Sequence, residues 1–236
     1  MTDGRTNSPR DGRRRAILAI DTATTRIVVA IGSPDGQVEG IATWEAGYRH
    51  GETLLATTSR FLAELNIRRS RLTAIVVGIG PGAFTGLRVG MATAKGLAHG
   101  LGLPIVGIST AEALLAGSPD GNGDGRPVLL LPAGPSDRIL VRRGGRPERL
   151  AGGDEPALAG DEHLIAVDLV GRAPQDAIEL GEAARARLGA ALLSLGAARL
   201  RAGDVDDLAG LVPEYVTLPR GITSQTGEVE WSRDPR

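Results

Sequence analysis

The sequence contains no cysteine, so disulfide bonds, thiolate nucleophiles and cysteine-based metal sites are excluded. Aromatic residues make up only 3% of the chain, and no apolar run is long enough to cross a bilayer. Lys95 is the only lysine among 27 basic residues, and together with 34 glycines this indicates a mutationally biased genome rather than an arginine-based function. The formal net charge of −1 gives no global attraction to nucleic acids or membranes. We therefore expect a cytoplasmic protein whose 236 residues form one or two domains.

The N-terminal part of the chain changes character at residue 16. Residues 1–15 are polar and arginine-rich and lack the apolar core of a signal peptide, so we expect a disordered extension. Three apolar segments follow, Ala16–Ile20, Ile27–Ile31 and Val38–Trp44, and polar turns separate them. Short apolar runs joined by such turns predict an antiparallel meander of three strands.

A glycine-rich segment, Gly78–Gly90, is the centre of the sequence. It follows Thr73–Val77, which is typical of a buried strand, and precedes a helical pattern that continues to about His99. It is therefore a strand-to-helix turn, in which Thr85 is expected to cap the helix. The segment is neither a P-loop nor a GxGxxG dinucleotide turn. It is open whether this turn binds an anion or a nucleotide phosphate, docks a partner, or only makes a tight connection.

The remaining elements give the fold class. Apolar residues between Leu54 and Leu65 have helical spacing, Pro104–Gly107 resembles a strand, and Ser109–Glu112 is a capping box that opens a further helix. The order β-β-β-α-β-α-β-α is typical of one lobe of the α/β fold that actin-like proteins, sugar kinases and heat-shock ATPases share (ASKHA, RNase H-like). We expect two lobes, the second one reduced, with a long helix over Ile178–Leu200. The expected domains are a disordered extension at 1–15, an actin-like lobe at 16–117, a reduced lobe at 126–219 and a loose tail at 220–236.

Three stretches of the first half carry a family resemblance. They are Ile17–Thr24 (ILAIDTAT), His50–Leu55 (HGETLL) and Gly80–Gly90 (GPGAFTGLRVG), the last continuing into Ala94–Ala98 (AKGLA) and Gly107–Thr110 (GIST). On these residues the sequence resembles the TsaB (YeaZ) family. Its members are non-catalytic subunits of the bacterial machinery that places threonylcarbamoyl on the tRNA adenosine next to the anticodon, in ANN-decoding tRNAs. The resemblance covers residues 16–116 and is nearly absent over residues 120–170.

The resemblance implies a scaffold that pairs with the catalytic TsaD subunit, works with the TsaE ATPase in the full complex, and forms a homodimer when alone. It implies that tRNA is bound only through the complex and that the chain carries no catalytic or metal-binding residue. No cofactor is expected on the chain alone, and ATP or ADP at the partner interface is left open. Gly86 and Gly90 would leave a bare stripe where another helix packs, and Arg88, Ala92, Lys95 and His99 share a basic face. The expected partner-interface residues are His50, Glu52, Leu54, Leu55, Thr58, Phe61, Gly86, Arg88, Gly90, Met91 and Lys95.

Other interpretations of the same residues stay open. Asp21 lies where actin-like ATPases have their first phosphate loop, and an acid there can hold a hydrated magnesium ion. Equally, Asp21 can end a strand and cap a turn. The candidates for a vestigial phosphate loop are Asp21, Thr22, Thr24, Gly80, Gly82 and Thr85. The alternative function is an ATP-dependent phosphotransferase that uses Asp21 and the Gly80–Gly90 turn, and a third hypothesis is direct tRNA binding through residues 1–15.

The three histidines give little support for a metal site. None of His50, His99 and His163 has a second histidine four residues on, the spacing that a helical metal site needs. His50 and Glu52 are expected to lie at the start of a helix, where Glu52 favours the positive end of the helix dipole. Near the C-terminus, Val212–Tyr215 is expected to return toward an apolar environment.

Overall fold

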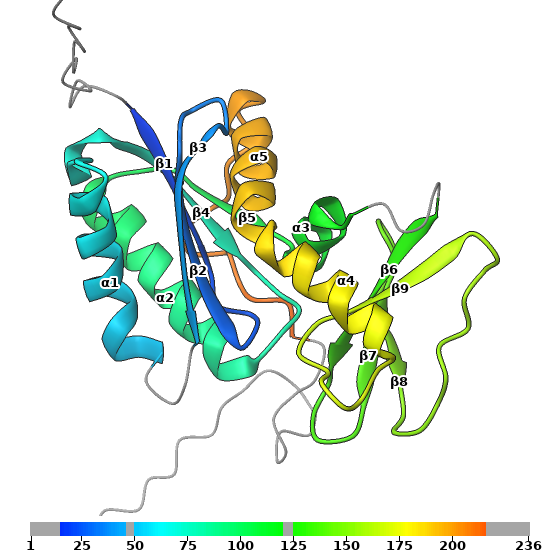
Figure 1. Ribbon diagram of the computed structural model, residues 1–236. Coiled ribbons are helices and arrows are strands. Elements are labelled where there is room, and N and C mark those ends of the chain that lie inside the picture. The colour runs from blue at the N-terminus through cyan, green and yellow to red at the C-terminus, as the bar shows by residue number, and fades with distance from the viewer. Residues whose placement is uncertain (1–14, 46–49, 120–124, 216–236) are drawn as a thin grey trace, which may run out of the picture.

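The computed structural model describes residues 15–45, 50–119 and 125–215, and only the backbone of residues 50–52. The predicted N-terminal extension up to residue 14, residues 46–49 and 120–124, and the predicted tail lie outside these residues. The described part forms two α/β lobes, each built on its own sheet (Figure 1). The predicted two-lobed α/β fold class is therefore confirmed. None of the described helices combines the length and the apolar character that a membrane span requires.

The first sheet has five strands in the order β3-β2-β1-β4-β5. As predicted, β1, β2 and β3 form an antiparallel meander, while β4 lies parallel to β1 and β5 lies parallel to β4. The strands are β1 Ala16–Asp21, β2 Arg26–Gly32, β3 Val38–Glu45, β4 Leu72–Gly78 and β5 Ile105–Ile108. Because both faces of the central strands are covered, β1 is buried along its whole length and is continuously apolar up to Asp21.

Helices cover the two faces of the first sheet. On one face, α1 (His50–Glu64) and α2 (Phe84–Leu101) pack over Leu18 and Ile20, and a short 3-10 helix, η1 (Arg69–Arg71), precedes β4. On the other face, α5 (Leu188–Arg201) and α3 (Thr110–Gly117) pack over Ile17 and Ala19. Alternate residues of β1 therefore contribute to two separate hydrophobic cores.

The second sheet repeats the first in a shorter form. Its order, β8-β7-β6-β9, matches β3-β2-β1-β4, with the same parallel and antiparallel pairings. The strands are β6 Arg126–Pro132, β7 Arg138–Val141, β8 Glu148–Leu150 and β9 Glu162–Ala166. In the described part of this lobe no strand corresponds to β5 and no helix joins β8 to β9. One helix, α4 (Gln175–Ala186), packs on β9.

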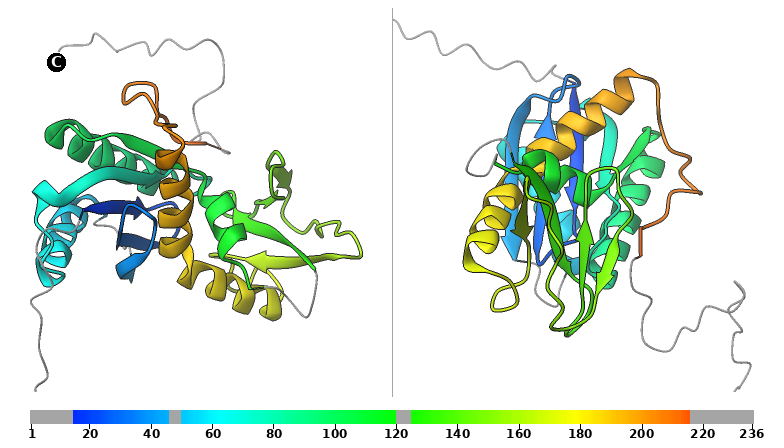
Figure 2. Two further views of the ribbon diagram at one scale, coloured as in Figure 1. Left: turned by 90° about the horizontal axis from the view of Figure 1, so that it is seen from above. Right: turned by 90° about the vertical axis from the view of Figure 1, so that its right-hand side faces the viewer.

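The long helix predicted over Ile178–Leu200 is two helices. The chain turns at Arg187, so that α4 packs on the second sheet and α5 on the first (Figure 2). Each helix uses a glycine for a close approach to its own sheet: Gly181 faces the backbone of Ala166 in β9, and Gly196 faces Val76 in β4. The segment predicted as the second lobe thus includes a helix that covers the first.

The structure contradicts the predicted N-terminal cap of α2 and confirms that of α3. The prediction that Thr85 caps α2 is wrong: the cap residue is Ala83, which makes no side-chain cap hydrogen bond, and Thr85 lies inside the first turn. The predicted cap of α3 is confirmed, because the Ser109 side chain accepts a hydrogen bond from the amide of Glu112.

Candidate functional site

The glycine-rich turn between β4 and α2 is pressed against the loop that follows β1. A Cβ atom on Gly78 would lie 1.8 Å from a carboxylate oxygen of Asp21, and one on Gly82 would lie 2.2 Å from the carbonyl oxygen of Ala23. The amide of Ala83 donates a 2.7 Å hydrogen bond to the same carbonyl oxygen. Only glycine permits the turn after β4 to approach the loop after β1 so closely. The contact between these two segments therefore explains why the turn is rich in glycine.

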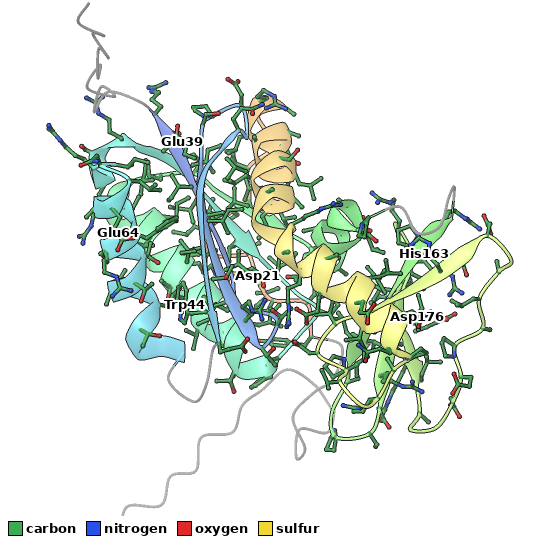
Figure 3. All side chains as sticks on the ribbon, viewed as in Figure 1. Asp21, Glu39, Trp44, Glu64, His163 and Asp176 are labelled. Carbon is green, nitrogen blue, oxygen red and sulfur yellow. The ribbon has the colours of Figure 1, made fainter. Side chains whose placement is uncertain are left out.

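Asp21 is fully buried beneath this turn (Figure 3). One carboxylate oxygen accepts from the amide of Ala23 at 2.9 Å, and the other accepts from the hydroxyl of Thr110 at 2.7 Å. The Thr110 hydroxyl in turn accepts from the amide of Gly80 at 3.1 Å. Burial raises the pKa of Asp21 above its usual range, against the opposing effect of the Thr110 and Ala23 hydrogen bonds. The hydrogen bonds of the Asp21 carboxylate and Thr110 therefore link the segments that follow β1, β4 and β5 of this chain.

The other predicted phosphate-loop threonines are also hydrogen-bonded within the lobe. The Thr22 hydroxyl donates to the carbonyl oxygen of Gly86 at 2.7 Å, and the Thr24 hydroxyl donates to the carbonyl oxygen of Arg26 at 2.9 Å. A Cβ atom on Gly86 or Gly90 would come within 2.1 Å of Thr22. The stripe of Gly86 and Gly90, predicted to receive a helix of a partner, is therefore filled by the loop after β1. Among the phosphate-loop candidates, Thr85 is exposed and is not drawn into this contact.

Several residues predicted at the partner interface are buried in the core instead. Leu54, Thr58 and Met91 face the sheet and are at most 5% exposed. Phe61 is partly buried and packs over Gly40 of β3. Hydrophobic periodicity identified these positions correctly as one face of a helix, but that face points inward. Leu54, Thr58 and Met91 are therefore covered by this chain itself. The side chains of His50 and Glu52 lie outside the described residues.

The outer surface of α1 and α2 is open. Leu55 of α1 is 51% exposed. On α2, Ala92, Gly96 and His99 are exposed, and a Cβ atom on Gly96 would meet nothing within 4 Å. The two helices contact each other on one face of the sheet (Figure 1). We call Leu55, Ala92, Gly96 and His99 the outer helix face. Gly96 was not among the predicted site residues, although it lies in the AKGLA stretch that carried the resemblance.

Two predicted interface residues, Arg88 and Lys95, contact the C-terminal segment of the described chain, residues 203–215. The Arg88 guanidinium lies 3.9 Å from the centroid of the Phe84 ring and donates to the Tyr215 hydroxyl at 3.3 Å. The rings of Phe84 and Tyr215 are 5.0 Å apart. The Lys95 ammonium donates to the carbonyl oxygen of Ala209 at 3.2 Å. The expected return of Val212–Tyr215 to the core is only partial, because Val212 is 64% exposed.

An open pocket of about 680 Å³ lies between the lobes. Its walls come from the turn after β4, the start of α3, the β7–β8 hairpin and the C-terminal segment; Ser109, Glu112, Arg146, Glu214 and Tyr215 are among them. Burial, with a smaller contribution from the nearby Glu112 charge, raises the pKa of Glu214. Sequence reasoning missed this pocket because its walls are far apart in the chain and short motifs do not mark them.

The described histidines do not come together. His99 is exposed on α2 in the first lobe, whereas His163 belongs to β9 in the second lobe (Figure 3). Both ring nitrogens of His163 are buried and make no hydrogen bond with the part of the chain that the structure describes. The His50 side chain lies outside that part. His99 and His163 therefore do not form the pair of ligands that a metal site would need.

A protein-family model described as "TsaD: tRNA N6-adenosine threonylcarbamoyltransferase" matches residues 32–186. The chain is 37% identical over 118 residues to an Escherichia coli protein named "tRNA threonylcarbamoyladenosine biosynthesis protein TsaB", covering 50% of each chain. It is 33% identical over 100 residues to the Bacillus subtilis protein of the same name, covering 42% of this chain and 43% of that protein. The chain spans about half the length or less of the curated relatives it matches.

Among solved structures, "YeaZ from Pseudomonas aeruginosa" matches with a TM-score of 0.66 and 24% sequence identity. The match covers 86% of this chain and all of the other chain. At this identity the likeness shows a common fold. It extends over both lobes, whereas the curated sequence matches to TsaB cover at most half of the chain.

Proposed function

The chain belongs to the TsaB (YeaZ) family, within the family described as tRNA N6-adenosine threonylcarbamoyltransferases, and from this membership we propose that it is a scaffold and activating subunit. Its partner in this proposal is the catalytic TsaD subunit. The complex, with the TsaE ATPase, places threonylcarbamoyl on the tRNA adenosine next to the anticodon. The chain itself supplies no catalytic group and contacts tRNA only through the complex.

The observation that carries the proposal is the outer helix face. Leu55 on α1 and the small residues Ala92 and Gly96 on α2 are exposed on the two helices that cover one face of the first sheet, so the backbone of a partner helix can approach α2 closely. The outer helix face itself contains no Lys, Arg, Asp or Glu side chain to desolvate, and Arg88 and Lys95 on the same side of α2 already contact Tyr215 and Ala209. A second copy of the chain covers it in isolation, and TsaD replaces that copy in the complex.

The loop after β1 supports a non-catalytic role. Asp21, Thr22 and Thr24 have the residue types of a phosphate loop, but they bond to Thr110, Gly86 and Arg26 of the same chain. Gly82 closes the gap between this loop and the turn after β4. A phosphate chain would have to break these contacts to enter, so we regard the loop as a structural remnant.

Light scattering after size exclusion tests the pairing, on the chain alone and mixed with the TsaD subunit of the same organism. We expect a homodimer that converts to a heterodimer. Leu55→Arg and Gly96→Arg place a long cation on the outer helix face and are expected to weaken both assemblies by roughly 30-fold or more, as at an interface hot spot. Gly96→Arg has open space in the monomer, so it leaves the fold intact, whereas any side chain at Gly90 would strike Thr22.

The matched controls carry the same substitutions in the second lobe. Leu158→Arg replaces a leucine that is 39% exposed, and Gly160→Arg replaces a glycine with nothing within 4 Å of its Cβ position. Both controls are expected to pair like the unchanged chain. Absence of any complex with TsaD, or equal pairing by all four variants, would contradict the proposal.

The alternative function, an ATP-dependent phosphotransferase, is kept because the inter-lobe pocket has the volume of a small-molecule site. Its signature would be nucleotide turnover by the isolated chain that Asp21→Asn abolishes. ATP or ADP at the interface with TsaD is a separate proposal. Calorimetric titration of the chain with ADP, with and without TsaD, distinguishes the two, because an interface site binds only in the presence of TsaD.

A further inference from the structure

The loop after β1 receives a carboxylate from the other lobe. Asp168 follows β9 in the second lobe, and its side chain reaches Thr25 in the first lobe. One carboxylate oxygen accepts from the Thr25 amide at 2.7 Å, and the other accepts from the Thr25 hydroxyl at 2.6 Å. Two adjacent donors of one loop residue thus hold the two oxygens of one anion. This is how a loop binds a free carboxylate or a phosphoryl group.

Arg185 completes the contact from the second-lobe side. Its guanidinium donates at 2.7 Å to the Asp168 oxygen that also accepts from the Thr25 hydroxyl, and it lies 3.3 Å from that hydroxyl. The side chains of Arg185 and Asp168 are only 7% and 8% exposed. Arg185 also pairs with Glu182, which makes a longer contact of 3.8 Å to Arg26 of the first lobe. Asp168 is therefore a buried, charge-compensated anion at the border between the lobes.

The backbone of Asp168 is suited to this task. Its φ angle of 58° is in the left-handed region, which few residue types other than glycine, asparagine and aspartate adopt readily. The short side chain leaves the end of β9 at this angle and meets the loop after β1. A helical or extended backbone at residue 168 would direct the side chain elsewhere.

We propose that the Asp168 carboxylate is a built-in occupant of the anion-binding position of the loop after β1, and that this contact adds to the hydrophobic core shared by the two lobes in holding them together without a nucleotide. The donors that would hold a phosphoryl group are occupied by an anion that cannot diffuse away. The inference does not depend on whether the chain pairs with TsaD.

The test uses two variants that keep the backbone conformation. Asp168→Gly removes the carboxylate and accepts the positive φ without strain, and Asp168→Asn keeps the shape but removes the charge. Breaking this buried pair by Asp168→Gly is expected to lower the melting temperature by on the order of 10 °C. Amide hydrogen exchange at Thr25 should become roughly 10- to 100-fold faster, because a charge-assisted hydrogen bond is lost. Asp168→Asn should show both effects in smaller measure.

Chemical rescue separates an anion site from a merely structural contact. Sodium acetate or inorganic phosphate, compared with sodium chloride at equal ionic strength, should restore part of the lost melting temperature of Asp168→Gly and slow exchange at Thr25 again. The unchanged chain should show no such specific response. The control variant Asp161→Asn removes an exposed ion pair with Arg126 in the second lobe and should also show none.

Two results would overturn the proposal. The first is unchanged Thr25 exchange and melting temperature in both Asp168 variants, which would mean that the contact does not hold the lobes. The second is loss of stability in Asp168→Gly that no added anion reverses, which would mean that Thr25 and Arg185 do not form an anion site. If Asp168→Gly does not fold, the amide hydrogen-exchange rate at Thr25 in Asp168→Asn tests the proposal instead. A rate equal to that of the unchanged chain would contradict the proposal.

Discussion

The two lobes share one strand order but are stabilised differently. Both lobes bury the two faces of their central strands, but the first lobe also fits its loops together through glycines such as Gly78, Gly82 and Gly86. The second lobe lacks a counterpart of β5 among the described residues, and its outer strands carry ion pairs. These include Arg126 with Asp161, Arg142 with Glu148 and Glu162, and Arg149 with Asp137.

The difference explains why the short family motifs lie in the first lobe. A glycine whose Cβ would strike a neighbouring backbone cannot be replaced without moving that backbone, so each such position prescribes one residue type. An exposed ion pair contributes little, and many other residue pairs can replace it. The motif residues therefore lie in the first lobe. The expectation that the resemblance is nearly absent over residues 120–170 was wrong, because the family model matches residues 32–186.

The largest contrast is expected between glycines of one helix. Gly86→Ala places a Cβ 2.1 Å from the carbonyl oxygen of Thr22, and the strain should cost about 2–3 kcal/mol, or roughly 5–10 °C in melting temperature. Gly96→Ala, ten residues further along α2, meets open space and should stabilise the helix by about 1 kcal/mol. Thermal unfolding of both variants measures the difference. Equal melting temperatures would mean that the contact between the loop and α2 is not rigid.

An intermediate contrast is expected in the pH dependence. Burial raises the pKa of Asp21 above its ordinary value of 3.8, so the folded state holds this proton more tightly than the unfolded state. The contribution of Asp21 to stability therefore falls as the pH rises from that value through the raised pKa. Hydrogen bonding from Arg126 instead lowers the pKa of Asp161, so its contribution is present above 3.8 and is lost as the pH falls through the lowered pKa.

Denaturant unfolding over a pH series checks these two signs. Asp21→Asn should remove a component of stability that decreases with pH, and Asp161→Asn should remove one that increases with pH. Components of the same sign would contradict the contrast between a buried acid in the first lobe and a paired surface acid in the second.

The smallest effect is expected for the ion pairs of the second lobe. Arg126→Gln removes the contact to Asp161, in which the two side chains are 67% and 57% exposed, and its melting temperature should stay within about 2 °C of that of the unchanged chain. The difference should shrink further in high salt, because exposed charges are screened. A larger, salt-independent loss would show that the second lobe depends on this ion pair as strongly as the first depends on its glycines.

The fold was largely predictable because its signals are local. Three apolar runs with polar turns gave the β1–β3 meander, and Ser109–Glu112 gave the start of α3. The break at Arg187 was not predictable. An apolar pattern on more than one face indicates burial, but not that the first half of a helix serves one sheet and the second half another. Only the tertiary arrangement decides where such a helix turns.

The candidate site was predictable in its segments but less so in its side chains. The HGETLL and GPGAFTGLRVG stretches do mark the start of α1 and the turn before α2. Whether Leu54 or Leu55 points outward depends on how α1 is rotated over the sheet. The absence of a side chain at Gly86 permits a close contact either with Thr22 of the same chain or with a partner helix, and the sequence does not distinguish the two. Asp168 carried no sequence signal, because its role arises from a contact between residues 143 positions apart.

Threonylcarbamoyl transfer to tRNA by TsaD and TsaE, with the unchanged chain, Asp21→Asn or Gly96→Arg added, tests the central claim most directly. The scaffold account predicts that the unchanged chain and a folded Asp21→Asn variant support transfer equally, whereas Gly96→Arg does not and its control Gly160→Arg does. Loss of transfer with Asp21→Asn, together with full transfer with Gly96→Arg, would contradict the account, because it would place the function in the loop after β1 rather than on the outer helix face.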